Sequence, residues 1–434
     1  MRLLCLYPWL ALGGADKFNL DMLNQLRQRG WQIRIATTLT SDHAWRSAFE
    51  PLCEQIVDLI AYPPDHWPAQ LLVLAQDCDV VCISHSQAGY LFLPFLRAHL
   101  PQTAFVDYCH MLEPSWLKGG FPRLSVRHSA YLDVEIVSSH QLEAWMHQQG
   151  APAEQIQVCT TNIDPYFWDR AQIDGAAVRA RYRLPSDARI VLYAARLTRQ
   201  KQPPLAAEVM RSIASIFPDV LFVVAGDGEY FAWMQDFVER HALQERVRLL
   251  GAQPNASVRE LLAISSIFFL PSENEGISLA IYEAMAMGVV PLSADVGGQR
   301  ELVTEECGVL VQRGPREQEA YREALTKLLS DPQRLAAMGA AARQRVLDHF
   351  SLDAMGERID QLLRQALARR RNRLDALEAR ASSDQISPAE ADVAAKKAVA
   401  FVAAELAARD RSWSARLQPA RILRSLMRRL RGEV

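Results

Sequence analysis

Short apolar runs separated by helix-sized segments recur along most of this chain, and the alternation is present twice. The first series covers residues 3–7, 31–37, 79–83, 103–108 and 134–138. A second series begins near Arg189 and covers residues 190–195, 221–225, 247–250, 267–270, 289–292 and 309–311. Fully apolar strands that alternate with helices are typical of parallel sheets with both faces covered. The sequence therefore predicts an α/β protein with two consecutive doubly wound, Rossmann-like domains.

The 434 residues are enough for two or three domains with cores of their own. We place the first domain at residues 1–170, the second at 171–370 and a helical tail at 371–434. The first apolar run also resembles part of a secretory signal peptide, but no small-residue cleavage site follows it. We interpret it as a strand, followed by a loop and by a helix that ends at Gly30.

Residues 271–303 combine a loop, a helix and a strand in an arrangement suited to anion binding. The polar turn 272–276 follows an apolar strand, residues 278–287 are rich in helix formers, and Gly288 supplies a left-handed end. The N-terminus of such a helix directs free backbone N–H groups at the carboxyl edge of a parallel sheet. We therefore expect an anion, above all a phosphate, to bind here.

Two carboxylates bracket this helix N-terminus, Glu275 in the loop and Glu283 inside the helix. Glu283 lies among apolar residues and should be largely buried, so it needs a polar partner. A hydroxyl-rich ligand such as a ribose or a sugar would be one. The alternative interpretation is a helix of a nucleotide-binding domain in which the glutamate is incidental.

The spacing from Glu275 to Glu283 belongs to a longer frame, PSxxEG…EAMxxG…GG…E. The frame is completed by Gly276, Ala284, Gly288, Gly297, Gly298 and Glu301. It resembles the donor-site signature of the retaining GT-B glycosyltransferases of family four. The resemblance spans roughly residues 2–350 and is stronger in the second domain. It implies a GT-B fold, in which two Rossmann-like domains face a cleft and the last helix crosses back onto the first domain.

The resemblance also implies roles for particular residues. Glu283 would hold the ribose of a nucleotide-sugar donor, and Glu275 would hold the donor sugar together with the backbone of Gly276, Ile277 and Ser278. Arg196 and Lys201 would stabilise the departing diphosphate in place of a metal ion. His110 would orient the sugar from the first domain. Neither a metal nor a bound cofactor is therefore expected.

The residues themselves permit simpler interpretations. Two cations after a parallel strand, Arg196 and Lys201, suit a diphosphate, but they also fit a solvated basic loop. A histidine after a strand, as at His110, is often structural. The strand-end glycines suit a nucleotide pocket or a tight turn. These loop residues are Gly13, Gly14, Gly226, Asp227 and Gly251.

Two positions depart from the family pattern. Ala195 stands where glycine usually precedes the arginine, and Asn162 stands where glycine is usual in the segment TNID at 161–164. Asparagine tolerates a left-handed backbone better than most residues, so the turn at Asn162 is expected to survive.

Charge and cysteine content restrict the partners. The formal net charge of −2 argues against nucleic-acid binding. The seven cysteines are dispersed without a C-x-x-C pair, which indicates reduced thiols in a cytoplasmic protein.

The tail differs from the globular part. Ser387, Pro388 and Glu390 form the signature of a capping box, and an alanine-rich helix to about Arg411 follows. Residues 411–434 are basic, with apolar residues at helical spacing between the arginines. Such a helix fits an anionic membrane surface, and a solvated helix or a linker to a partner are the alternatives.

These observations favour a retaining glycosyltransferase that moves a sugar from a nucleotide-sugar donor to a glycan or glycolipid acceptor. The basic tail and the aromatic loop 116–121 suggest cell-envelope polysaccharide synthesis at the inner face of the membrane. A nucleotide-sugar epimerase on the same fold and a non-catalytic, membrane-recruited scaffold that binds sugar nucleotides are the alternatives. The sequence does not identify the sugar, the base or the acceptor.

Overall fold

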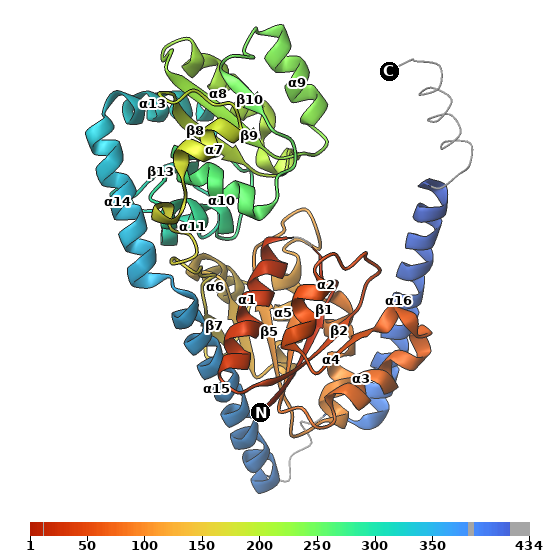
Figure 1. Cartoon of the computed structure of the whole chain (residues 1–434). Helices are drawn as coiled ribbons and strands as arrows, with labels where there is room; N and C mark the ends of the chain where they lie inside the picture. Colours follow the sequence, from red (N-terminus) through yellow and green to blue (C-terminus); the bar gives the residue numbers. More distant parts are fainter. Residues whose placement is uncertain (12, 381–385, 417–434) are drawn as a thin grey trace.

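The computed structural model describes residues 1–11, 13–380 and 386–416. It consists of two lobes, each built on one parallel sheet (Figure 1). The first sheet has the strand order β3-β2-β1-β4-β5-β6-β7. Its strands are β1 (Arg2–Tyr7), β2 (Gln32–Thr37), β3 (Gln55–Asp58), β4 (Val80–Ser84), β5 (Ala104–Cys109), β6 (Val134–Val137) and β7 (Ile156–Val158).

Helices cover both faces of this sheet. They are α1 (Gly14–Gln28), α2 (Arg46–Phe49), α3 (Trp67–Ala75), α4 (Gln87–His99), α5 (Phe121–His128) and α6 (His140–Gln148). Short 3-10 turns lie at Glu50–Leu52, Leu59–Ala61, Pro64–His66 and Ser129–Tyr131. Alternate residues of β1 point to opposite faces, as the two-residue period of a strand requires. Cys5 and Tyr7 therefore pack against α1, whereas Leu4 and Leu6 pack against α3 and α4.

The second sheet has the order β10-β9-β8-β11-β12-β13. Its strands are β8 (Arg189–Ala194), β9 (Val220–Ala225), β10 (Val247–Leu249), β11 (Ser265–Leu270), β12 (Val290–Ala294) and β13 (Val309–Val311). The surrounding helices are α7 (Gly175–Arg181), α8 (Pro203–Ala214), α9 (Phe231–Arg240), α10 (Asn255–Ala263), α11 (Leu279–Ala286), α12 (Gln299–Leu302), α13 (Glu317–Ser330) and α14 (Pro332–His349). Two more 3-10 turns lie at Arg170–Gln172 and Arg199–Lys201.

The predicted α/β class and the strands predicted from apolar runs are confirmed, to within one or two residues at their ends. The first run is an interior strand of its sheet, paired with β2 and β4. The prediction missed β3 and β7, because these short edge strands carry polar residues such as Gln55 and Gln157 and form no apolar run. The predicted reduced state of the cysteines agrees with seven free thiols.

The last two helices return to the first lobe (Figure 1). Helix α15 (Leu352–Arg380) packs on α1, so residues 352–370, which we grouped with the second domain, pack with the first sheet. Helix α16 (Pro388–Arg416) packs on α4, against the opposite face of that sheet. The two helices thus enclose the first lobe from both sides.

The predicted capping box at the start of α16 is present. Ser387 Oγ accepts a hydrogen bond from the backbone N–H of Glu390, and Glu390 Oε2 accepts one from the backbone N–H of Ser387. In the part of the chain that the structure describes, no helix is long and apolar enough to cross a membrane. Side chains of the basic segment 411–434 lie outside the described residues.

Two carboxyl groups are buried side by side in the first sheet. Asp107 on β5 and Glu135 on β6 are paired in register, and both are fully buried. Tyr90 donates a hydrogen bond to Asp107 Oδ2 over 2.6 Å, and Ser125 donates one to Glu135 Oε2 over 2.7 Å. Burial, followed by the nearby charge of Glu135, raises the pKa of Asp107 to about 8. Burial also raises the pKa of Glu135.

This pair predicts a stability that decreases with pH. The unfolded chain releases the Asp107 proton near pH 4, whereas the folded protein keeps it up to about pH 8. The free energy of unfolding should therefore fall across that interval, by up to roughly 1.4 kcal/mol per pH unit for each such carboxyl. Urea unfolding at several pH values measures the slope. The Asp107→Asn variant should have a shallower slope, and an unchanged slope would contradict the assignment.

Candidate active site

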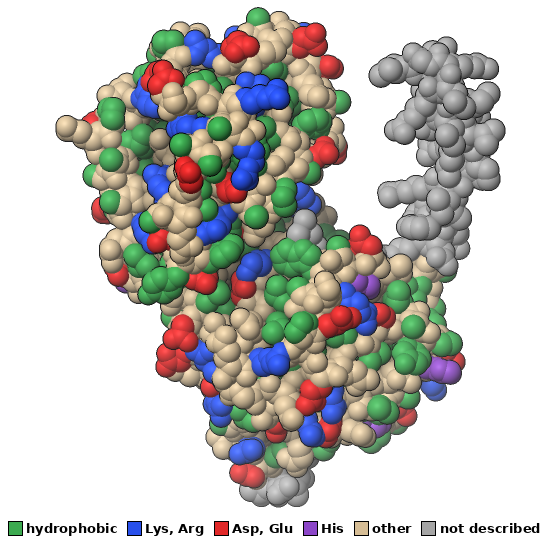
Figure 2. Space-filling model, in the orientation of Figure 1, with side chains coloured by type: hydrophobic (Ala, Val, Ile, Leu, Met, Phe, Trp, Pro, Cys, Tyr) green, Lys and Arg blue, Asp and Glu red, His purple; other side chains and the backbone are tan. Residues whose placement is uncertain are grey.

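The two sheets face each other at the positions where ligands bind in this architecture. Strand order reverses between β1 and β4 in the first sheet and between β8 and β11 in the second. Ligands of open parallel sheets bind beyond the carboxyl ends of the strands at such reversals. The loops that follow these four strands line one cleft of about 820 Å³ between the lobes. Hydrophobic side chains gather on the edge of the lower lobe that faces the upper one (Figure 2).

The N-terminus of α11 opens into this cleft. Ser278 precedes the helix with an extended backbone, and its side chain does not cap the first turn. Ile277, Ser278 and Leu279 line the cleft, so the backbone N–H groups of the first turn are available to a ligand. Gly288 ends the helix with a φ of 69°, which confirms the predicted left-handed end.

A buried ion pair lies beside the helix N-terminus. The ammonium group of Lys201 contacts Glu275 Oε1, and the two side chains are only 14% and 9% exposed. The hydroxyl of Tyr193 holds the Lys201 backbone by donating a hydrogen bond to its carbonyl oxygen over 2.8 Å. Arg196, two residues after the end of β8, is exposed and lines the same cleft. The structure therefore brings Arg196, Lys201 and Glu275 together at the carboxyl ends of β8 and β11.

Glu283 is buried on the first turns of α11, as predicted, with 7% of its surface exposed. Burial raises the pKa of this carboxyl to about 8. Lys17, a residue of α1 in the first lobe, lowers the pKa, and Asp21 on the same helix raises it. These charges act from the opposite lobe, so Glu283 lies where the two lobes meet.

His110 follows β5 and lines the cleft from the first lobe. Its ring packs against Tyr108 at 4.5 Å and His85 at 4.7 Å between centroids, and Nε2 lies 3.2 Å from Ser84 Oγ. Burial and the neighbouring His85 lower the pKa of His110 well below its usual value. The imidazole is therefore neutral near pH 7 and suited to hydrogen bonding with a sugar hydroxyl.

The glycine-rich loops have different positions. Gly14 lines the cleft, at the start of α1. Gly226 and Asp227 are not among its lining residues. A Cβ at position 226 would lie 1.9 Å from the carbonyl oxygen of Ala195, and the Asp227 carbonyl accepts a hydrogen bond from the backbone N–H of Leu197. Their loop therefore supports the segment that carries Arg196 and does not reach the cleft in this structure.

Gly276 and Gly297 permit close backbone approach. A Cβ at Gly276 would lie 2.2 Å from the His110 carbonyl oxygen in the other lobe. Gly297 has a φ of 58°, and a Cβ there would lie 2.1 Å from the Glu275 carbonyl oxygen. The absence of a side chain at Gly276 and Gly297 thus lets the loop before α11 lie close to the first lobe and to the 297–301 segment.

Asp16 is a cleft residue to which we assigned no role. It lies in the first turn of α1, is 8% exposed, and burial raises the pKa of its carboxyl to about 6. The only sequence signal was its position two residues after Gly14, at a predicted helix start.

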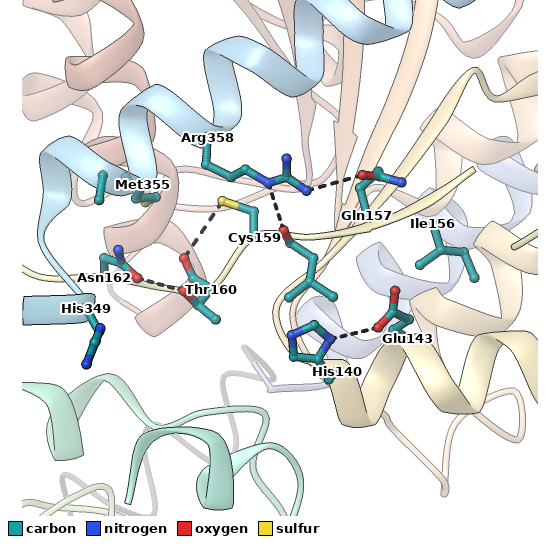
Figure 3. Close-up of a pocket in the computed structure, with 12 residues that line it drawn as sticks. His140, Glu143, Ile156, Gln157, Cys159, Thr160, Asn162, His349, Met355 and Arg358 are labelled. Carbon is teal, nitrogen blue, oxygen red and sulfur yellow. Dashed lines mark hydrogen bonds and ion pairs between the residues drawn. The ribbon is translucent and has the colours of Figure 1, made fainter. Parts of the chain in front are cut away.

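The chain crosses between the lobes beside a second cavity of about 460 Å³ (Figure 3). Ile163 exchanges backbone hydrogen bonds with Phe350 and Leu352, and Asn162 donates its amide to the Ser351 carbonyl over 2.8 Å. Asn162 is not among the residues with positive φ, so the expected left-handed turn is absent. The asparagine instead joins the two crossing segments. Arg358 borders this cavity and hydrogen-bonds to the Val158 carbonyl (Figure 3).

Glu301 also connects the two lobes, beside His140, which lines the same cavity. Its two carboxylate oxygens accept hydrogen bonds from the backbone N–H groups of His140 and Gln141, over 2.9 and 3.0 Å. These are the first residues of α6, so a carboxylate of the second lobe caps a helix of the first.

No group of three or more potential metal ligands is present among the described residues. The sequence contains one D-x-D spacing, Asp77 and Asp79, before β4 and outside the residues that line the cleft. Asp77 pairs with Arg2 and Arg34, and Asp79 accepts a hydrogen bond from the Arg2 backbone.

Two facing Rossmann-like lobes with a cleft between them form the GT-B arrangement that the resemblance implied. Residues 176–345 match the family model described as glycosyl transferases group 1. This match covers the second lobe, and together with the similar proteins described next it shows a GT-B glycosyltransferase, as the resemblance implied.

The chain is also similar to individual proteins in sequence and in structure. The chain is 27% identical to an N-acetyl-alpha-D-glucosaminyl L-malate synthase of Bacillus anthracis, over 79% of this chain and 91% of the synthase. It is 28% identical to the amylovoran biosynthesis glycosyltransferase AmsK of Erwinia amylovora, over 56% of this chain and 57% of AmsK. The crystal structure of Anabaena HepE in complex with UDP matches with a TM-score of 0.72 and 20% identity, over 84% of this chain and 99% of HepE. Neither an epimerase nor a scaffold finds support in these similarities.

Proposed function

We propose that this protein transfers a sugar, with retention of anomeric configuration, from a nucleoside-diphosphate sugar to a hydroxyl group of a glycan or glycolipid. The observation that carries the proposal is the convergence of Arg196, Lys201 and the α11 N-terminus on one cleft. Cations and free backbone N–H groups together suit a diphosphate.

The reaction breaks the bond between the anomeric carbon and the diphosphate and forms a bond to the acceptor oxygen. Negative charge grows on the leaving diphosphate, where Arg196 and Lys201 stabilise it. The acceptor proton passes to a diphosphate oxygen on the same face of the sugar. Glu283 binds the ribose hydroxyls, Glu275 and the Gly276 backbone hold the sugar, and neutral His110 hydrogen-bonds to it. The residues themselves supply the positive charge, so the proposed reaction needs no metal.

A thermal-shift panel of uridine, guanosine and adenosine diphosphate sugars in the presence of EDTA tests the proposal. A bound donor at about a hundred times its dissociation constant should add roughly 2.7 kcal/mol to the free energy of unfolding. One nucleotide class should stabilise the protein without added metal. Absence of stabilisation by every member of the panel, with and without magnesium, would contradict the donor assignment.

We further propose a cytoplasmic location, with peripheral attachment to the inner face of the cell membrane and a role in cell-envelope polysaccharide synthesis. The basic composition of residues 411–434 supports attachment to anionic lipid. Removal of these residues should lower co-flotation with vesicles that contain phosphatidylglycerol, because the removed arginines supply the attraction. Donor binding should remain unchanged. Equal flotation of the truncated and the full chain would contradict the attachment.

A further inference from the structure

Helix α16 forms part of the wall of the donor cleft. Three residues on one face, Ala395, Ala398 and Val402, are at most 5% exposed and belong to the apolar cluster that includes α4. The small side chains let α16 lie close to α4, whose N-terminus starts at the cleft. The same face then reaches the cleft itself, because Val402 and Leu406 are among its lining residues.

A short loop packs beside this end of α16. Trp116 and Phe121 line the cleft, with ring centroids 4.8 Å apart, and both belong to the apolar cluster that contains Val402 and Leu406. The loop is fixed by backbone hydrogen bonds from Gly119 and Gly120 to the Trp116 carbonyl oxygen. Trp116, Phe121 and Leu406 are each partly exposed, so apolar surface faces the cleft.

The cleft is therefore chemically divided. Arg196, Lys201 and Glu275 make its donor end charged. The other end is lined mainly by apolar side chains of α16 and of the 116–121 loop, together with the acidic residues Glu113 and Glu405. Aromatic rings alone would suit a sugar ring, but the aliphatic side chains of Val402 and Leu406 form no hydrogen bonds with hydroxyl groups. An alkyl chain, in contrast, gains free energy when it leaves water for such a surface.

We propose that the acceptor carries an apolar chain, and that α16 and the 116–121 loop form the subsite that binds this chain. The proposal rests on the proposed glycosyl transfer and assigns its acceptor to the lipid-linked class. In this arrangement, the hydroxyl-bearing end of the acceptor points toward His110 and the donor, and its chain lies on Trp116, Phe121, Val402 and Leu406.

The test compares two probes, methyl β-D-glucoside and octyl β-D-glucoside, below the concentration at which the latter forms micelles. Dissociation constants come from NMR titration of the full chain. The wild type should bind the octyl probe at least about tenfold more tightly than the methyl probe, because several methylene groups become buried. Equal affinities would overturn the proposal.

A pair of variants tests where the alkyl chain of the probe binds. Leu406→Ser should weaken octyl binding by roughly tenfold and leave methyl binding unchanged. Phe401→Ser is the matched control, because Phe401 lies on the same helix, is 39% exposed and does not line the cleft. Equal losses in the two variants would overturn the subsite.

Addition of UDP, GDP and ADP to the same samples separates this inference from the proposed function. If one nucleotide stabilises the protein, but the affinity for the glucoside probe does not depend on its alkyl chain, the subsite is overturned and the transferase assignment remains intact. Chain-length dependence that Leu406→Ser removes, without stabilisation by any nucleotide, would support the subsite and count against the donor site.

Discussion

Replacement of Lys201 by alanine is expected to lower the turnover number by about two to three orders of magnitude, the largest effect that we predict. The Lys201 ammonium group is mostly buried and lies at the donor end of the cleft. Preorganised charges that stabilise a leaving group in such a site contribute about 3–4 kcal/mol to the transition state. Loss of this cation should therefore lower kcat more than it raises KM for the donor. Release of free nucleoside diphosphate from the donor, identified by the thermal-shift panel, measures the rate.

The control for Lys201→Ala is Arg199→Ala in the same 3-10 turn. The Arg199 side chain is 80% exposed, and its ion pair with Glu273 spans 3.8 Å. An exposed pair of this kind contributes little to stability, and Arg199 does not line the cleft. Its removal should change turnover less than about twofold. Similar rates in the two variants, with both folded by circular dichroism, would show that Lys201 does not act on the leaving group.

Replacement of Glu283 by glutamine is expected to stabilise the free protein and to weaken donor binding by roughly 10- to 150-fold. The folded protein holds the pKa of this carboxyl at about 8, above its usual value of 4.5. The ionised form is thus disfavoured in the fold, so the carboxyl lowers stability progressively as pH rises from 4.5 to about 8. Glutamine is uncharged and removes this penalty. Above about pH 8, where the carboxyl is ionised, the ribose hydroxyls lose a charged acceptor that contributes about 1.5–3 kcal/mol.

Calorimetric titration with the stabilising nucleoside diphosphate, together with urea unfolding at pH 6 and pH 9, measures both effects. Glu317→Gln is a matched control, because Glu317 is 8% exposed and also has a raised pKa, but lies on α13 outside the cleft. Its substitution should leave nucleotide affinity unchanged. Unaltered affinity in Glu283→Gln would exclude the proposed contact with the ribose.

Much of the fold was predictable because parallel strands covered on both faces leave a strong local signal. Apolar runs such as 190–195 and 267–270 need no knowledge of the rest of the chain to be assigned as strands. The helix stop at Gly288 and the capping box at Ser387 are likewise local. Edge strands such as β3 gave no signal, because only one of their sides is paired and polar residues are tolerated there.

The candidate site was predictable only in part. The burial of Glu283 followed from the apolar residues around it on one helix, and the cations after β8 followed from their position at a strand end. The sequence could not place Gly226 relative to the cleft, because a glycine at a strand end serves a ligand and a close backbone contact equally well. Asn162 was expected to need a left-handed backbone, but its amide bonds to Ser351 instead.

The sequence by itself determined the two Rossmann-like units, the anion-binding helix N-terminus and the residue types of the donor end. Only the tertiary structure decided which of these groups meet. The Lys201–Glu275 contact, the Glu301 cap on α6 and the approach of Lys17 to Glu283 join residues that are far apart in the chain. The apolar wall formed by α16 also depends on how that helix docks on α4. Such contacts depend on the packing of whole helices and lobes, which local propensity and spacing do not encode.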